Sequence, residues 1–273
     1  MPATALAFAL GAACLHAVWN LLLARAKDTE AATVVALVTA EVVFAPVALI
    51  VWNAHASVWP YLAGSGAFEL AYFGLLATAY RLVPLSVVYP LARGGAPVLV
   101  LVVGVIFLGH GTSWSQAAAV ALIVGGVLMV RGLGHADPRS VAFGLSIAAC
   151  IAGYTLIDKH GVQHAGPITY LELSMLGPTA VYTAAILRTK GGAAVRAAIA
   201  PATITAGVAT FVAYALVLAA LQRASAASVA AVRETSVVIA TLLAVPVLRE
   251  RVPPARLAGA VLVVGGIALL ALR

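Results

Sequence analysis

The stretch VVYPLARGGAPVLVLVVGVIF, residues 87–107, places one arginine, Arg93, inside an otherwise apolar run that also carries Pro90 and Pro97. A second stretch, VAAVRETSVVIATLLAVPVL at residues 229–248, places Arg233 inside another apolar run, 140 positions further along the chain. An apolar run of about 20 residues spans a bilayer as a helix. Because a charge within such a helix is costly, each arginine is expected to face a partner or a water-filled space.

Composition extends this interpretation to the whole chain. Of the 273 residues, 63% are hydrophobic and only 9% are charged, whereas soluble domains carry about a quarter charged residues. The net charge of +7 comes from residues spread over short loops, which argues against a nucleic-acid partner. Two cysteines in apolar runs and no Cys/His cluster predict neither a metal site nor a cofactor. The composition therefore indicates a polytopic membrane protein.

Apolar runs separated by short polar breaks predict ten membrane helices. The expected spans are 3–24, 31–52, 58–80, 84–107, 114–131, 140–158, 166–187, 201–221, 225–248 and 254–272. The span at 84–107 contains three prolines, so we expect it to be kinked or locally broken. Trp52, Trp59 and Trp114 fall near helix ends, where interfacial tryptophans are common.

The two halves of the chain resemble each other. LIVGGVLMV (122–130) matches LVVGGIALL (262–270), AYFGLLATAYR (71–81) matches AYALVLAALQR (213–223), and FALGAACLHAVWN (8–20) matches FGLSIAACIAGYT (143–155). Five helices per half is an odd number, so the halves must have opposite orientations. We predict an all-α integral membrane protein with ten transmembrane helices, built as two inverted five-helix repeats (residues 1–133 and 139–273) around a central cavity. The glycine pairs at 125–126 and 265–266 should allow close helix packing.

This pattern resembles the EamA-type drug/metabolite transporter superfamily. The resemblance covers the whole chain, and its main features are HAVWN at 16–20 and AYRLVPLSVVYPLARGGAPVLVLVVGVIFLGHG at 79–111. One departure is His110, where such proteins usually have a glutamate; the second half keeps it as Glu250. The resemblance implies an inner-membrane exporter of small metabolites, in particular amino acids, aromatic ones included. A flippase of lipid-linked sugars is the alternative within the same fold.

Ionisable residues inside the predicted spans are the candidates for a substrate site. The carboxylate of an amino acid suits a guanidinium, and its ammonium suits a carboxylate or an aromatic ring. We expect Arg93, more than Arg233, to contact the carboxylate, because Glu234 and Glu172 are local partners for Arg233. His16 is expected to form an interhelical hydrogen bond. The predicted substrate-binding residues are Arg93, Trp19, Asn20, Tyr72, Tyr89, Glu69, Tyr154, Glu172, Tyr214 and Arg233.

The mechanism expected from these features is alternating access, with Pro90, Pro97 and Pro246 as points of bending and the lipid bilayer and a small solute as partners. We expect a monomer, with a dimer through the glycine-rich helices as the alternative. No signature of an intramembrane enzyme or of an ATP-binding loop is present, so no catalytic residue is predicted. Of the 14 Lys and Arg outside the two buried arginines, 11 fall on one side, which predicts both termini outside the cytoplasm.

Overall fold

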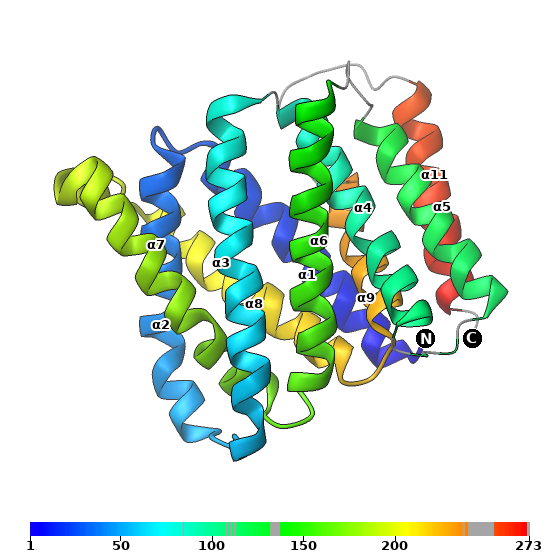
Figure 1. Cartoon of the computed structure of the whole chain (residues 1–273), viewed down its shortest axis with the longest axis horizontal. Helices are drawn as coiled ribbons and strands as arrows, with labels where there is room; N and C mark the ends of the chain where they lie inside the picture. The colour runs from blue at the N-terminus through cyan, green and yellow to red at the C-terminus, as the bar shows by residue number, and fades with distance from the viewer. Residues whose placement is uncertain are drawn as a thin grey trace.

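The computed structural model describes residues 1–83, 85–107, 109, 111, 113–131, 137–236, 238–239 and 254–271. Within these residues the chain is helical and forms no strand (Figure 1). The helices are α1 (Ala3–Ala24), α2 (Thr29–Ile50), α3 (Trp59–Leu82), α4 (Leu85–Ile106), α5 (Trp114–Arg131), α6 (Pro138–Gly161), α7 (Pro167–Ala197), α8 (Pro201–Leu221), α9 (Ala226–Arg233) and α11 (Pro254–Ala271), with a short 3-10 turn, η1 (Ala56–Val58), before α3.

Capping residues explain where several helices begin. The side chain of Asp28 accepts a hydrogen bond from the Ala31 amide at the start of α2, and Asp137 accepts from two amides at the start of α6. Such caps satisfy amides that have no partner within the helix. Prolines occupy the first turn of α3, α6, α7 and α8, where a missing N–H costs nothing.

The predicted spans agree with the helices to within a few residues except at two places. Helix α7 reaches Ala197 because the chain continues past Gly191, whose φ of 78° and ψ of 163° bend it. Helix α9 ends at Arg233, since the Glu234 amide bonds to the carbonyls of Ala231 and Val232 in a tightened turn. The predicted continuous helix at 225–248 is therefore interrupted at Glu234. Pro246, His110 and Glu250 lie outside the described residues.

The expected break in the Arg93 span is absent. Helix α4 is continuous from Leu85 to Ile106 and includes Pro90 and Pro97. Proline is tolerated in membrane helices because neighbouring helices and local adjustments satisfy the freed backbone groups. The interruption lies beside Arg233 instead of beside Arg93.

Helices from the two sequence halves pack against each other in matched pairs. Helix α1 packs on α8 while α3 packs on α6, and α2 packs on α7 while α5 packs on α11. Figure 1 shows α2 with α7 at one edge of the molecule and α5 with α11 at the other. Helices α2 and α7 are each the second helix of their half, and α5 and α11 are each the last. Helix α1 with α8, and α6 with α3, each pair the first helix of one half with the third helix of the other. A twofold relation between the halves requires this exchange.

Two glycines set the separation of α5 and α11. A Cβ at Gly126 would collide with the Gly259 carbonyl, and one at Gly266 would lie 2.8 Å from the Ala119 carbonyl oxygen. Gly125 and Gly265 have nothing within 4 Å of such a Cβ. The predicted close packing is therefore confirmed for Gly126 and Gly266, inside one chain, whereas Gly125 and Gly265 take no part in it.

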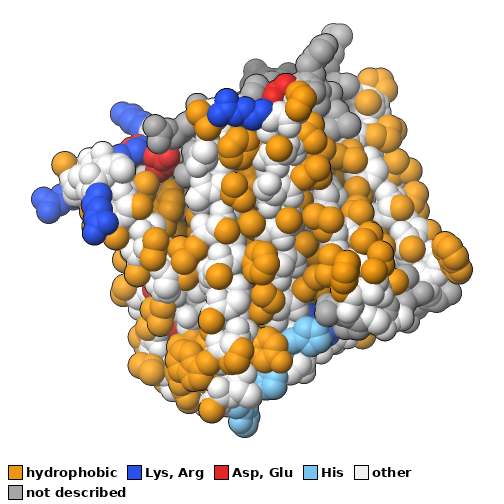
Figure 2. Space-filling view, viewed as in Figure 1, with side chains coloured by type: hydrophobic (Ala, Val, Ile, Leu, Met, Phe, Trp, Pro, Cys, Tyr) orange, Lys and Arg blue, Asp and Glu red, His pale blue; other side chains and the backbone are white. Residues whose placement is uncertain are grey.

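The outer surface is apolar where lipid would contact it. Helices α1, α2, α6 and α8 are each long and apolar enough to cross a membrane. Figure 2 shows apolar side chains over the middle of the molecule, with Lys and Arg side chains gathered near one end. Trp52, Trp59 and Trp114 are 50%, 60% and 93% exposed. Their exposure near helix ends fits an interfacial belt.

Candidate functional site

A central cavity lies between helices of both halves. Its empty space amounts to about 1070 Å³, including the part open to solvent. Helices α1, α2, α3 and α4 contribute residues from the first half, and α6, α7, α8 and α9 contribute from the second. The polar and aromatic side chains that line it are His16, Trp19, Thr33, Glu41, Glu69, Tyr72, Phe73, Arg93, Tyr154, Thr210, Phe211, Tyr214 and Arg233. Both buried arginines therefore reach the cavity, as expected from the sequence.

A guanidinium cluster occupies one part of this cavity. Glu234 Oε1 lies 3.5 Å from Arg93 Nη1 and 3.7 Å from Arg233 Nε, so one carboxylate lies between both arginines. Arg93 Nη2 lies 2.9 Å from His16 Nε2. Because a guanidinium cannot accept a hydrogen bond, this ring nitrogen of His16 is the acceptor and the ring is neutral. The predicted interhelical hydrogen bond of His16 is confirmed, between α1 and α4.

The shared carboxylate changes the expected pairing. Glu234 and Glu172 were expected to be local partners of Arg233. In the structure Glu234 also contacts Arg93, because the turn after α9 places Glu234 opposite α4, which packs on α9. This contact joins the two halves at the cavity.

A second cluster in and beside the cavity consists of four carboxyl groups. Glu41 of α2 accepts a 3.5 Å hydrogen bond from Thr179 of α7, and it interacts with the neighbouring carboxyl of Glu172. Glu69 of α3 interacts with Glu41 and with Asp158 of α6. Within the described residues none of these four carboxyls has an ion-pair partner within 4.0 Å. Glu41 and Glu69 line the cavity, whereas Glu172 is buried beside Glu41 and is not part of the lining.

Asp158 is a site residue that the sequence prediction missed. The predicted span ended at Asp158, but α6 continues to Gly161 and leaves this side chain only 1% exposed. Its two oxygens accept hydrogen bonds from the hydroxyls of Tyr170, at 2.8 Å, and Tyr214, at 2.6 Å. Asp158 follows Tyr154 by four residues, and this i, i+4 spacing on one helix face was the available signal.

Aromatic side chains line the cavity wall between these clusters. Tyr154 lies 6.1 Å from Tyr214 and 6.4 Å from Tyr72, measured between ring centroids. Trp19 also lines the cavity, 4.7 Å from the ring of His16. Asn20 instead lines an adjoining vestibule, and its amide donates to the His16 carbonyl oxygen. The side chain of Tyr89 lies outside the described residues.

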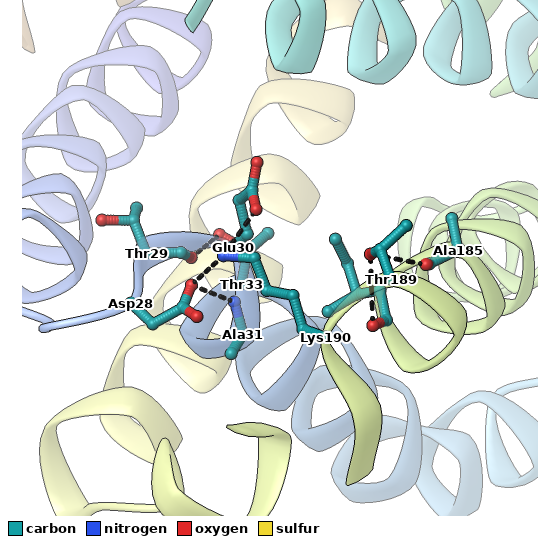
Figure 3. A network of polar contacts seen from close by, with 9 residues as sticks. Asp28, Thr29, Glu30, Ala31, Thr33, Ala185, Thr189 and Lys190 are labelled. Carbon is teal, nitrogen blue, oxygen red and sulfur yellow. Dashed lines mark hydrogen bonds and ion pairs between the residues drawn. The ribbon is translucent and has the colours of Figure 1, made fainter. Parts of the chain in front are cut away.

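The vestibule connects the cavity to one face of the protein. It shares Trp19, Tyr72 and Arg93 with the cavity and extends to Asp28, Glu30 and Lys190. Figure 3 shows Lys190 of α7 reaching across to the start of α2, where its Nζ lies 2.7 Å from Asp28 Oδ1 and 2.6 Å from Glu30 Oε2. The hydrogen bond from Lys190 lowers the pKa of Asp28, and the two carboxylates raise the pKa of Lys190.

At the opposite face of the protein, polar contacts join the two halves. The Gly166 amide donates to Asn53 Oδ1 at 2.7 Å, and Ser57 Oγ lies 2.8 Å from His164 Nδ1. Gln116 at the start of α5 donates to Ser228 of α9 at 3.0 Å. The cavity therefore opens toward the face with Lys190, whereas these contacts join the two halves at the face with His164.

Comparisons with known proteins identify the family. Residues 138–272 match the profile of the EamA-like transporter family. A search of curated proteins finds no match. A solved structure titled "Crystal structure of protein" is similar over 100% of this chain and 98% of its own, with a TM-score of 0.79 and 17% sequence identity. At that identity, the likeness shows the fold. Residues 138–272 therefore form a domain of the EamA-like transporter family, in the drug/metabolite transporter superfamily, and the chain is a multi-pass membrane protein whose domain implies the movement of small solutes across a membrane.

Proposed function

We propose that this protein exports amino acids, aromatic ones included, across a bacterial inner membrane by alternating access. Two five-helix repeats, residues 1–133 and 139–273, move about the central cavity without covalent chemistry and without a cofactor. The family profile, which covers residues 138–272, coincides with the second of these repeats. The matched packing of α1 on α8 and α3 on α6 supports the same division.

The observation that carries the amino-acid assignment is the presence of guanidinium and carboxyl groups in one cavity lining. Arg93 and Arg233 supply the guanidinium groups, and Glu41 and Glu69 supply carboxyl groups. A zwitterionic solute presents a carboxylate for the first and an ammonium for the second. Carboxylate atoms of Glu41 and Glu69 are buried without a hydrogen-bond partner among the described residues, so a bound ammonium would satisfy them.

The aromatic wall supports an apolar or aromatic side chain in the substrate. Trp19, Tyr72, Tyr154 and Tyr214 all line the cavity. Aromatic faces bind apolar groups, and they also attract an ammonium. Four rings in one cavity lining are well suited to an aromatic amino acid.

The face toward which the cavity opens supports the proposed direction of transport. The vestibule opens beside Lys27 and Lys190, on the more basic side of the protein. By the positive-inside rule this side is cytoplasmic, which places both termini outside. The structure is then the inward-open state, in which an exporter loads its substrate.

Counterflow in proteoliposomes tests the function. Liposomes loaded with unlabelled L-phenylalanine should accumulate external labelled L-phenylalanine, whereas empty liposomes and labelled D-glucose should show no accumulation. Repeating the measurement with an imposed pH gradient distinguishes proton antiport from exchange. The absence of counterflow for a panel of aromatic and aliphatic amino acids would contradict the proposal.

A labelling experiment tests the orientation separately. In a protein without Cys14 and Cys150, a membrane-impermeant maleimide added outside the cell should label Ala56→Cys and should leave Thr189→Cys unlabelled. Ala56 lies at the face with His164, and Thr189 lies at the face with Lys190. The reverse pattern would place the termini in the cytoplasm.

A further inference from the structure

The guanidinium of Arg233 has hydrogen-bond donors without an acceptor in the part of the chain that the structure describes. Arg233 is 3% exposed, ends α9 and lines the central cavity. Its Nε and Nη2 are buried without a hydrogen-bond partner among the described residues. Glu234 Oε1 lies 3.7 Å from Nε, which is too long for a hydrogen bond. Buried polar groups are nearly always paired, so unpaired donors on a residue that lines the cavity point to a ligand.

The two open nitrogens form one edge of the guanidinium. Nε and Nη2 direct their N–H bonds side by side, and this edge matches the two oxygens of a carboxylate. A single acceptor atom, such as a carbonyl, would satisfy only one of them. The geometry therefore selects a planar oxyanion as the missing partner.

Arg93 differs because the protein already engages its guanidinium. Its Nη2 donates to His16 and its Nη1 approaches Glu234. These contacts come from α1 and from the turn after α9, so they hold Arg93 between the two halves. The sequence had favoured Arg93 for the carboxylate, since Glu234 was expected to occupy Arg233.

We propose that Arg233 binds the carboxylate of the transported solute through Nε and Nη2, and that Arg93 acts as a positioning residue for Glu234. This inference rests on the proposed function insofar as the solute is an amino acid. The rest of the solute would lie against Tyr154 and Tyr214, which line the same cavity. Tyr214 is fixed in place because its hydroxyl donates to Asp158.

The test compares an amino acid with its decarboxylated amine. Proteoliposomes with wild type, Arg233→Lys or Arg93→Lys are used, since lysine keeps the charge but loses the planar edge. L-Phenylalanine and phenethylamine each compete with labelled L-phenylalanine. Arg233→Lys should weaken competition by phenylalanine by about tenfold or more and leave the amine unchanged. Arg93→Lys should weaken both to the same extent.

The opposite selectivity would overturn the assignment. If Arg93→Lys loses preference for the carboxylated competitor, or if Arg233→Lys weakens both competitors equally, Arg233 is only a structural partner of Glu234. If Arg233→Lys does not fold, the Arg93→Lys variant alone tests the proposal. That variant keeps Nε and Nη2 of Arg233, so it must still prefer phenylalanine, which has a carboxylate, over phenethylamine.

A binding measurement separates this inference from the proposed function. Phenylacetate, a carboxylate without an ammonium, should raise the apparent melting temperature of detergent-solubilised wild type and of Arg93→Lys but not of Arg233→Lys. If counterflow of amino acids is absent while this pattern holds, the amino-acid assignment fails and the carboxylate site stands. If phenylacetate stabilises none of the proteins, or all three equally, the site itself is refuted.

Discussion

The Nη2 of Arg93 donates to Nε2 of His16 across 2.9 Å, joining α4 to α1 at the wall of the central cavity. Replacing His16 with phenylalanine keeps a ring of similar size but leaves a buried charged donor unpaired. We expect a loss of about 1–3 kcal/mol of stability, seen as a lower apparent melting temperature in detergent. His16→Gln retains an acceptor and should lose less. Equal stability of wild type and His16→Phe would show that the contact contributes nothing.

Asp158 holds two tyrosines that have different positions. Tyr214 lines the cavity, whereas Tyr170 is fully buried outside it. Removing either hydroxyl by substitution with phenylalanine leaves an Asp158 oxygen without its partner, so both variants should lose about 1–2 kcal/mol of stability. Only Tyr214→Phe should also change the half-saturation concentration for counterflow. An equal change in both variants would mean that Asp158 acts on transport through folding alone.

Lys190 and its two carboxylate partners predict a flat pH response near neutrality. The pKa of Asp28 is lowered from 3.8, so its contribution is complete above that value and disappears as pH falls through the folded pKa. The pKa of Lys190 is raised from 10.5, so its contribution is complete below that value and is lost as pH rises through the folded pKa. The difference in apparent melting temperature between wild type and Lys190→Gln should stay constant from about pH 5 to about pH 9.

Arg188 supplies a control for the Lys190 measurement. It lies two residues earlier on α7 and has no ion pair within the described part of the chain. Arg188→Gln should therefore leave the melting temperature nearly unchanged. A pH-dependent difference for Lys190→Gln near neutrality would show that the ion pairs at the vestibule are not the source of its effect.

Gly191 and Gly192 form a matched pair at the bend of α7. Gly191 has a φ of 78° and a ψ of 163°, a conformation that residues with a Cβ rarely adopt, whereas Gly192 has no positive φ. Gly191→Ala should cost about 1–3 kcal/mol, and it should disturb the adjacent Lys190 contacts. Gly192→Ala should be neutral or slightly stabilising. Similar melting temperatures for the two variants would contradict the bend.

Gly126 and Gly125 test the packing of α5 on α11. A methyl group at Gly126 would meet the Gly259 carbonyl and Val263, whereas one at Gly125 would meet nothing. Gly126→Ala should therefore destabilise the protein by about 1–3 kcal/mol through overpacking, and Gly125→Ala should not. A size-exclusion measurement alongside the melting curve shows whether either variant changes the oligomeric state. If Gly125→Ala alone had an effect, the outward glycines would be an interface between copies of the chain.

The amino-acid sequence by itself determined most of the helical spans and indicated two similar halves. Apolar length sets where a helix can cross a bilayer, and caps such as Asp137 and prolines such as Pro201 set where it begins. Both signals are local, so the spans follow from neighbouring residues along the chain. The repeat was visible because equivalent helices need similar residues at equivalent positions, as at Gly126 and Gly266.

Only the tertiary structure decided which charged groups meet. The sequence places Glu234 next to Arg233, yet the turn that ends α9 brings Glu234 within reach of Arg93, 141 positions away. It also buries Asp158 beside Tyr214 and leaves two donors of Arg233, a residue that lines the cavity, without an acceptor among the described residues. Ionic and hydrogen-bonding contacts act over a few ångströms in directions set by backbone geometry. A single turn of backbone at Glu234, which no local pattern indicated, therefore determined that this carboxylate lies near both arginines.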